Sequence, residues 1–170
     1  MTQAILFYMP NEVPYGCFSN FYRAPLNVDG DVWPTSEHFF QAAKFFKTDP
    51  AWSSEIFNAK TPGEAAKKGR DRAHPLHPSW EAIKDDVMRA AVLTKFTQHP
   101  ELQKILLNTG DAVLVEHTTN DCYWADGGSV GKGKNMLGII LMEVREAIQS
   151  GKVTEFVAGF RARIADKMGR

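Results

Sequence analysis

Three polar side chains follow one another at helical spacing after Trp33-Pro34: Glu37, Gln41 and Lys44. Residues at i, i+4 and i+7 share one face of a helix, so an acid, an amide and an amine would form one narrow row. Glu37 would lie in the first turn, where the helix dipole favours a carboxylate. Such a row suits acid–base chemistry in a cleft, but many polar rows face solvent. The segment alone leaves both interpretations open.

A second polar cluster occupies residues 117–126, where carboxylates and aromatic residues alternate with turn formers. Asp121 stands between Asn120 and two aromatic residues, which makes it a candidate for chemistry. Asp126 precedes Gly127, and an Asp-Gly pair usually satisfies the backbone of its own turn. We keep Asp126 as a candidate for substrate binding beside Asp121.

The next segment, residues 128–134, matches the G-x-x-x-x-G-K pattern of phosphate-binding loops. Asn135 stands where a nucleotide-hydrolysing P-loop needs Ser or Thr for magnesium, and the preceding residues do not form the required buried strand. The sequence therefore argues against a P-loop enzyme. Glycines and lysines before a helix can still hold an anion through backbone amides, with Gly131, Lys132 and Asn135 as candidates.

Two arginines, Arg70 and Arg72, flank Asp71 beyond a predicted helix end. Guanidinium groups in such places pair bidentately with phosphate or carboxylate, whereas the alternative is a surface salt-bridge cluster around Asp71. His74 and His77 have no convincing third and fourth ligand, so we expect neither a metal site nor a cofactor.

Local signals predict a compact, mainly helical (α+β) fold with a small antiparallel sheet. Strands are expected at residues 5–8 and 112–115, with a hairpin over 26–33 that turns at Asp29-Gly30. Helices are expected over residues 36–46, after Asp49-Pro50, from Thr61-Pro62 to Gly69, over 79–98, 100–108 and 135–149, and in the last twenty residues.

The composition, 44% hydrophobic and 24% charged, is that of an ordinary soluble protein, and 170 residues suffice for a buried core. Twenty basic residues balance twenty acidic ones, so non-specific binding to nucleic acid or membranes is not indicated. Cys17 and Cys122 form no disulfide framework, and the first residues lack a secretory signal. We expect a cytoplasmic protein with one domain over residues 1–149 and a helical extension over 150–170.

Taken together, several blocks resemble the NADAR family, the YbiA-like N-glycosidases. The blocks are Tyr15-Gly-Cys-Phe-Ser-Asn-Phe21, Trp33-Pro-Thr-Ser-Glu-His38, Gln41-x-x-Lys44, Gly69-Arg-Asp-Arg72, Asn120-Asp-Cys-Tyr-Trp124 and Gly131-x-Gly-x-Asn135. The resemblance implies a compact, mainly helical enzyme that hydrolyses N-glycosidic bonds. It places the family's functional glutamate, lysine, tryptophan and aspartate on Glu37, Lys44, Trp80 and Asp121.

Family members act on phosphoribosylamino intermediates of riboflavin synthesis or remove ADP-ribose from guanine in nucleic acid. We expect the riboflavin type, because no toxin, antitoxin or macrodomain partner lies within these 170 residues. A small ribosyl phosphate is therefore the expected partner, and ADP-ribosylated nucleic acid is the alternative. Substrate-binding residues are expected to be Phe18, Ser19, Asn20, Trp33, Gln41, Arg70, Arg72, Trp80, Trp124, Asp126, Gly131, Lys132 and Asn135.

Two carboxylates can share the cleavage of a ribosyl C–N bond, with Glu37 at the sugar and Asp121 on the base side or positioning water. Trp80 and Trp124 would stack on the heterocycle. In a covalent variant, the free amine of Lys44 attacks the anomeric carbon and forms a Schiff base. We favour direct hydrolysis. Two alternatives are not enzymes: a sensor that binds ADP-ribose or a nucleotide without catalysis, and a scaffold that binds another protein.

Overall fold

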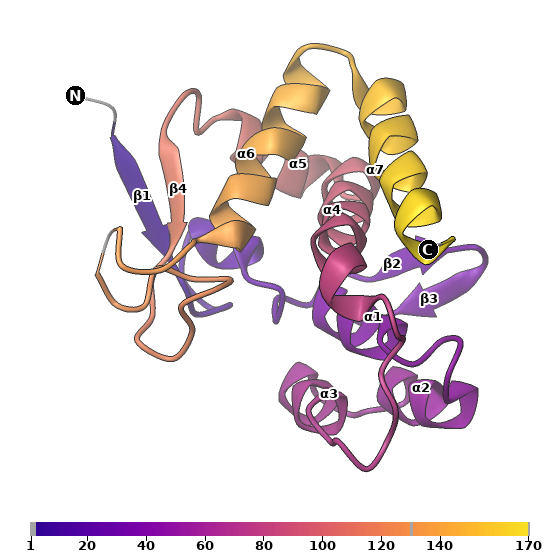
Figure 1. Cartoon of the computed structure of the whole chain (residues 1–170). Coiled ribbons are helices and arrows are strands. Elements are labelled where there is room, and N and C mark those ends of the chain that lie inside the picture. The colour runs from indigo at the N-terminus through magenta and orange to yellow at the C-terminus, as the bar shows by residue number, and fades with distance from the viewer. Residues whose placement is uncertain (1–2, 130, 170) are drawn as a thin grey trace.

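The computed structural model describes residues 3–129 and 131–169 and consists mainly of helices, with two small sheets (Figure 1). Its elements in chain order are β1 (Ala4–Phe7), the 3-10 helix η1 (Tyr15–Phe18), β2 (Leu26–Val28), β3 (Asp31–Trp33), α1 (Ser36–Ala43), α2 (Pro50–Phe57), α3 (Pro62–Gly69), α4 (Trp80–Gln98), α5 (Pro100–Leu107), β4 (Val113–Glu116), α6 (Met136–Gln149) and α7 (Val153–Met168). The expected mainly helical α+β fold is confirmed.

Capping side chains start the short helices where the sequence indicates. The Thr35 hydroxyl accepts the His38 amide at 3.2 Å and caps α1. Thr61 accepts the Glu64 amide at 3.1 Å, and the Glu64 carboxylate accepts the Lys60 amide at 2.9 Å. This reciprocal pair is close to a capping box. Helix α1 ends at Ala43, three residues earlier than expected, because the Phe45 amide turns back to the Ala42 carbonyl.

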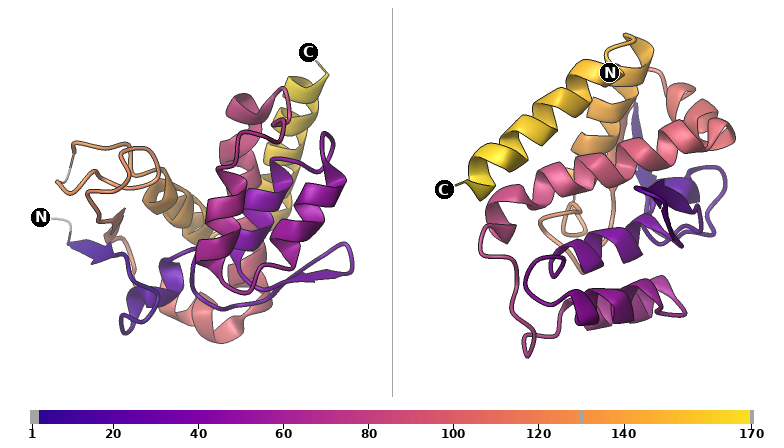
Figure 2. Two further views of the ribbon diagram at one scale, coloured as in Figure 1. Left: turned by 90° about the horizontal axis from the view of Figure 1, so that it is seen from below. Right: turned by 90° about the vertical axis from the view of Figure 1, so that its right-hand side faces the viewer.

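The helices stack in layers around the central helix α4. One face of α4 carries α7 and the other carries α1, and α1 in turn packs on α2 and α3 (Figure 2, right). Helix α6 covers strand β4 and also reaches α4. In the described part of the chain, no helix has both the length and the apolarity to span a membrane.

The two sheets have two strands each and differ in direction. Strands β2 and β3 form the expected antiparallel hairpin, with Leu26 opposite Trp33. Strands β1 and β4 pair in parallel, with Ile5 opposite Leu114, whereas the sequence analysis expected only an antiparallel sheet. Parallel pairing needs a crossover connection, and the crossover here contains five helices, which local patterns do not reveal. Both strands consequently end at the same edge.

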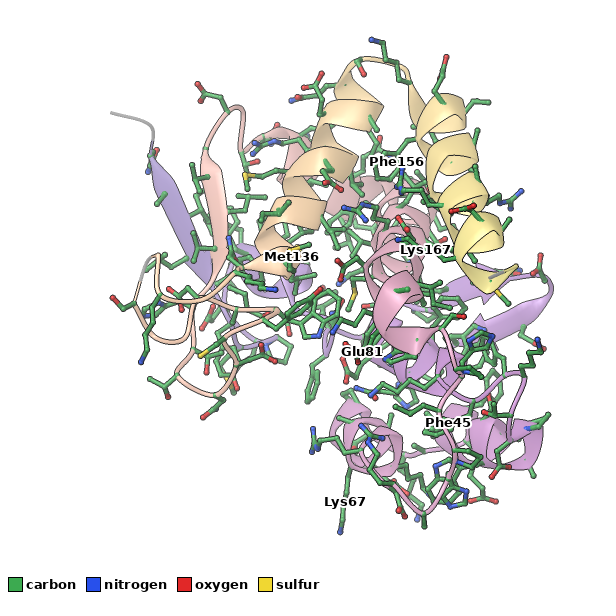
Figure 3. The ribbon with its side chains drawn as sticks, in the orientation of Figure 1. Phe45, Lys67, Glu81, Met136, Phe156 and Lys167 are labelled. Carbon is green, nitrogen blue, oxygen red and sulfur yellow. The ribbon has the colours of Figure 1, made fainter. Side chains whose placement is uncertain are left out.

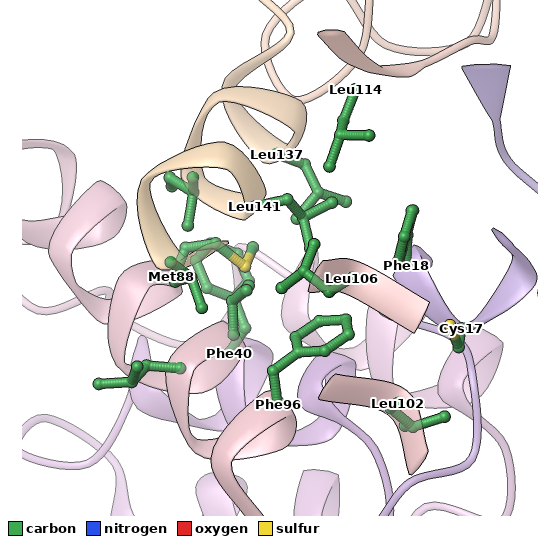
Figure 4. Close-up of a cluster of buried hydrophobic side chains, with 14 of the residues drawn as sticks. Cys17, Phe18, Phe40, Met88, Phe96, Leu102, Leu106, Leu114, Leu137 and Leu141 are labelled. Carbon is green, nitrogen blue, oxygen red and sulfur yellow. The ribbon is translucent and has the colours of Figure 1, made fainter. Parts of the chain in front are cut away.

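The main core fills the space between α1, α4, α6 and β4. Figure 4 shows that Phe40, Met88, Phe96 and Leu141 converge there. Gly138 lets α6 approach β4 closely, because a Cβ at this position would overlap the backbone carbonyl of Leu114. Burial of these apolar side chains is the main stabilising contribution to the fold.

Helix α7 is attached to α4 by a buried carboxylate as well as by apolar contacts. Asp86, on α4, is fully buried and accepts hydrogen bonds from Arg89 of its own helix and from Arg163 and Lys167 of α7, at 2.9 to 3.2 Å. Figure 3 labels Lys167 on the side of α7 that faces α4. A buried charge without such partners would be strongly unfavourable, so α7 completes the packing of α4.

Candidate active site

The polar row on α1 is buried, and the solvent-facing interpretation is therefore wrong. Glu37, Gln41 and Lys44 are 8%, 7% and 7% exposed. The Gln41 side-chain amide donates to Glu37 Oε1 at 2.7 Å, and Lys44 Nζ donates to the Gly69 carbonyl at 3.2 Å. The row lies against α3, since α1 and α3 pack together. Protein neighbours thus hold the Gln41 amide nitrogen and the Lys44 amine, while Gln41 Oε1 has no partner among the described residues.

A cavity of about 490 Å³ opens beside this row. It is lined from α1, α3, α4, the loop after β1, the segment around Asn20 and the loop after β4. The described residues that line it are Tyr8, Met9, Pro10, Ser19, Asn20, Phe21, Glu37, Phe40, Gln41, Ala66, Arg70, Met88, Glu116, Thr118, Asn120, Asp121 and Trp124. Its size suits a small ligand rather than a macromolecule.

Glu37 is positioned by the first turn of α1. Its amide donates to the Asn20 carbonyl at 3.1 Å, and the Ser36 hydroxyl donates to the Asn20 side chain at 3.0 Å. Burial raises the pKa of Glu37, while the hydrogen bond from Gln41 and the charge of Lys44 oppose that rise. A carboxyl group under these opposing influences is suited to exchanging protons.

Lys44 lies behind the cavity wall rather than among the residues that line it. Its Nζ is 5.8 Å from the centre of the Phe40 ring and 6.0 Å from that of Trp80. Burial, together with the nearby charge of Arg72, lowers the pKa of Lys44 to about 8, while the charge of Glu37 opposes the decrease. The amine therefore feels the charge of Glu37, but its hydrogen bond goes to the Gly69 carbonyl.

Asp121 reaches the same cavity from the loop after β4. Its Oδ1 accepts the backbone amides of Tyr123 and Trp124, both at 2.7 Å. These two bonds orient the carboxylate and leave Oδ2 without a partner among the described residues. Glu37 and Asp121, distant in sequence, are thus brought to one cavity.

The sequence analysis missed a third acid, Glu116, at the end of β4. Partial burial and the charges of Asp121, Glu37 and Asp126 together raise the pKa of Glu116 to about 8. A signal existed, because ligands bind beyond the carboxyl ends of parallel strands. This signal requires knowledge that β1 and β4 pair in parallel. The same knowledge would also have indicated Tyr8, which directly follows β1.

Aromatic side chains form part of the cavity wall. Trp124 lines the cavity as expected and meets the Phe40 ring edge to face at 5.2 Å. Phe40 and Phe21 were not among the expected residues. Trp80 is 4% exposed and packs behind Phe40 at 5.1 Å, so its ring supports the wall and is not available for stacking on a ligand.

Several expected substrate-binding residues have other places in the structure. Phe18 belongs to the main core, and Trp33 packs against Phe57 at 4.7 Å in a second apolar cluster. Arg70 lines the cavity, whereas the Arg72 guanidinium donates to the Gly69 carbonyl at 3.0 Å. Only one of the two arginines therefore stands in the cavity wall.

The glycine- and lysine-rich loop also lies outside the cavity wall. Asp126 is 1% exposed and holds His117 at 2.7 Å and the Gly128 amide at 2.8 Å, which is the turn chemistry of an Asp-Gly pair. Asn135 ties the loop to β4 through the Leu114 carbonyl at 2.8 Å. The described residues Gly131 and Lys132 are not among those that line the cavity, and Val130 lies outside the described residues.

Three carboxyl groups, a guanidinium group and aromatic rings in one small cavity are typical of enzymes that cleave glycosidic bonds. Comparison with known proteins identifies the family. The model of the NADAR domain matches residues 6–149, and the chain belongs to this family.

Named relatives agree with this assignment. The chain is 51% identical to the N-glycosidase YbiA of Escherichia coli strain K12 over 148 residues, which are 87% of this chain and 91% of YbiA. It is 43% identical to an N-glycosidase of Nostoc punctiforme, over 81% of this chain and 88% of that protein. The NMR structure of E. coli YbiA superposes with a TM-score of 0.81, covering 90% and 89% of the two chains. These matches confirm the prediction of an enzyme of the N-glycosyl hydrolase class.

Proposed function

We propose that this enzyme hydrolyses the ribosyl C–N bond of phosphoribosylamino-pyrimidine intermediates of riboflavin synthesis. The observation that carries the proposal is the meeting of Glu37, from α1, and Asp121, from the loop after β4, in one cavity of about 490 Å³. A relative in Vibrio vulnificus that is 41% identical over 88% of this chain is named a riboflavin biosynthesis protein, and this chain spans 40% of it. That name supports the choice of substrate.

The chemistry requires two kinds of help at the anomeric carbon. Positive charge develops on the sugar as the C–N bond breaks, and an attacking water must lose a proton. In our proposal the Glu37 carboxylate stabilises this charge and takes the proton from water. Asp121 orients the water through the carboxylate oxygen that accepts no backbone amide.

Binding groups around the acids fit the parts of such a substrate. The Arg70 guanidinium lines the cavity and would hold the phosphate, since arginine pairs bidentately with phosphate oxygens. The ring of Trp124 would pack on the pyrimidine. Asn20 and Asn120 line the cavity as well and offer amide groups to the polar edges of the ring or the sugar.

Direct hydrolysis fits this site better than a Schiff base on Lys44. The Lys44 amine donates to the Gly69 carbonyl, and its neighbours include the rings of Phe40 and Trp80. To attack the anomeric carbon it would have to lose its proton and leave this position. We assign Lys44 the role of a positive charge that acts on Glu37.

A second substrate class is favoured by one separate observation. A hollow of about 540 Å³ shares Arg70 with the cavity and is also lined by Trp52, the cations Lys67 and Lys68, and the acids Glu64 and Asp71. Two phosphates and a second ring system, as in ADP-ribose on guanine, would extend from the cavity toward the cations of this hollow. ADP-ribosylated guanine is therefore the alternative substrate.

One assay distinguishes these possibilities. Pure protein is incubated with an aminouracil ribosyl phosphate and, separately, with an ADP-ribosylated oligonucleotide, and the liberated base or ribose is measured. We expect rapid release from the first substrate. Faster release from the oligonucleotide would replace the proposed substrate by the alternative, and tight binding without release from either would indicate a sensor.

The mechanism is tested in the same assay with Glu37→Gln. The control is Glu55→Gln, at an exposed position of α2. An enzyme loses roughly 100-fold or more in turnover when a general acid–base group is removed, and it keeps its affinity for the substrate. A scaffold protein would show no change in ligand binding or turnover.

The proposal includes a cytoplasmic location for the protein. The free thiols of Cys17 and Cys122 fit a reducing cytoplasm.

A further inference from the structure

The acid that the sequence analysis missed, Glu116, is held in place more firmly than a loop residue would be. Its backbone amide donates to Asn135 Oδ1 at 2.9 Å, and its carbonyl accepts the Asp126 amide at 2.9 Å. It also pairs with Phe7 at the last position of the parallel sheet. Its side chain lines the cavity that Glu37 and Asp121 share.

The three acids differ in the partners of their carboxyl groups. Glu37 accepts a hydrogen bond from the Gln41 amide, and Asp121 accepts two backbone amides. These hydrogen bonds favour the ionised carboxylate, although burial opposes them at Glu37 and raises its pKa. Among the described residues, the carboxyl group of Glu116 has no hydrogen-bond donor.

The surroundings of Glu116 oppose its ionisation. The charged side chains that raise its pKa are Asp121 and Asp126 of the following loop and Glu37 of α1. The cation that lines the same cavity is Arg70, the neighbouring strand continues into Tyr8, and α6 is preceded by the neutral Asn135. Partial burial and the three acids together raise the pKa of Glu116 to about 8.

We infer that Glu116 is the general acid of this site and gives its carboxyl proton to the leaving nitrogen when the ribosyl C–N bond breaks. The inference rests on the proposed hydrolysis of a phosphoribosylamino-pyrimidine. The electron pair of the C–N bond stays on the nitrogen, which gains the proton of Glu116 and leaves as a neutral amine. The oxygen of water bonds to the anomeric carbon, and its proton moves to Glu37. Transfer of that proton back to Glu116 completes the cycle.

The test is Glu116→Gln with Glu101→Gln, an exposed residue of α5, as the matched control. Two substrates are compared: an aminouracil ribosyl phosphate, whose amine needs a proton to leave, and 4-nitrophenyl ribosyl phosphate, whose leaving group does not. We expect Glu116→Gln to lose roughly 100-fold or more in kcat on the first substrate and less than about 10-fold on the second. The wild-type rate on the first substrate should fall above pH 8, and the variant should lack this alkaline decrease.

The outcomes separate the two proposals. If the wild-type protein releases no amine from the aminouracil ribosyl phosphate, the proposed substrate fails and this inference with it. If the wild-type protein is active but Glu116→Gln matches Glu101→Gln, or is slowed equally on both substrates, Glu116 is not the general acid while the proposed function stands. Carboxyl ¹³C NMR of the wild-type protein provides a check that needs no folded variant. The assigned carboxyl resonance of Glu116 is expected to titrate near pH 8, and titration of that resonance in the ordinary range of a glutamate would overturn the inference.

Discussion

Gly69, the last residue of α3, is a sensitive link between the packing of two helices and the cavity. A Cβ at this position would overlap Gln41 Oε1 and would lie 2.6 Å from Gln41 Cδ and 2.9 Å from its Cβ. The end of the Gln41 side chain can rotate, but its Cβ is fixed to α1. Gly69→Ala must therefore push α3 away from α1 or move Gln41 off Glu37.

The expected cost follows from this geometry. Overpacking of a close contact costs about 1–3 kcal/mol, and alanine regains up to about 1 kcal/mol over glycine within a helix. We expect Gly69→Ala to lower the free energy of unfolding by about 1–2 kcal/mol. A hydrogen bond to a charged group is worth about 1.5–3 kcal/mol. If the substitution removes the bond from Gln41 to Glu37, the carboxylate loses this interaction and kcat/KM should fall roughly 10- to 100-fold.

Gly63 in the same helix is a matched control. A Cβ there would meet only the Thr61 hydroxyl, at 3.8 Å. Gly63→Ala should leave kcat/KM unchanged and raise stability by roughly 0.4–1 kcal/mol. Urea unfolding and steady-state kinetics on both variants measure the difference. If Gly69→Ala were as stable and as active as Gly63→Ala, the contact between α3 and Gln41 would not support the site.

Three further predictions concern the cations of the structure. Borohydride added during turnover should trap no substrate adduct on Lys44, and an adduct found by mass spectrometry would establish the covalent route. Arg70→Gln should raise KM for the phosphorylated substrate at least about 10-fold while KM for its dephosphorylated analogue stays unchanged, since only the phosphate contact is lost. Burial alone would raise the pKa of Asp86, but hydrogen bonds from Arg163 and Lys167 hold it below its ordinary value. The stability from these bonds is therefore present above the unfolded-state pKa and lost as pH falls through the lower folded-state pKa. Arg163→Gln should lower the free energy of unfolding by about 1–2 kcal/mol at pH 7, which is less than for a fully buried pair because the Arg163 side chain is part-exposed. The loss should be smaller in acid. The control Arg161→Gln, at an exposed position of the same helix, should change the free energy of unfolding little. Equal urea midpoints for the two variants at pH 7 would contradict this role of α7.

Local patterns predicted most of the helices, because their starts depend on neighbouring residues. Thr35, Asp49 and Thr61 cap α1, α2 and α3 through bonds to residues three positions ahead. The row of Glu37, Gln41 and Lys44 was predicted for the same reason. Its burial was not, since a polar row reads the same whether it faces solvent or another helix.

The substrate-binding residues were harder to predict than the acids. Phe18 and Trp33 lie in sequence blocks that resemble the family, and the resemblance also places a functional tryptophan on Trp80. Aromatic residues near a site also build the core that supports it. Their packing against other rings decides between these roles, and it appears only in three dimensions.

The sequence by itself determined the helical character of the chain and the family, and it named Glu37 and Asp121 as candidate acids, because each depends on residue types and short sequence blocks. Only the tertiary structure decided that β1 and β4 run in parallel and that Glu116 joins the other acids at their common edge. The physical reason is that strand direction here depends on how five intervening α-helices return the chain, and the raised pKa of Glu116 depends on charges that meet it only in the folded state.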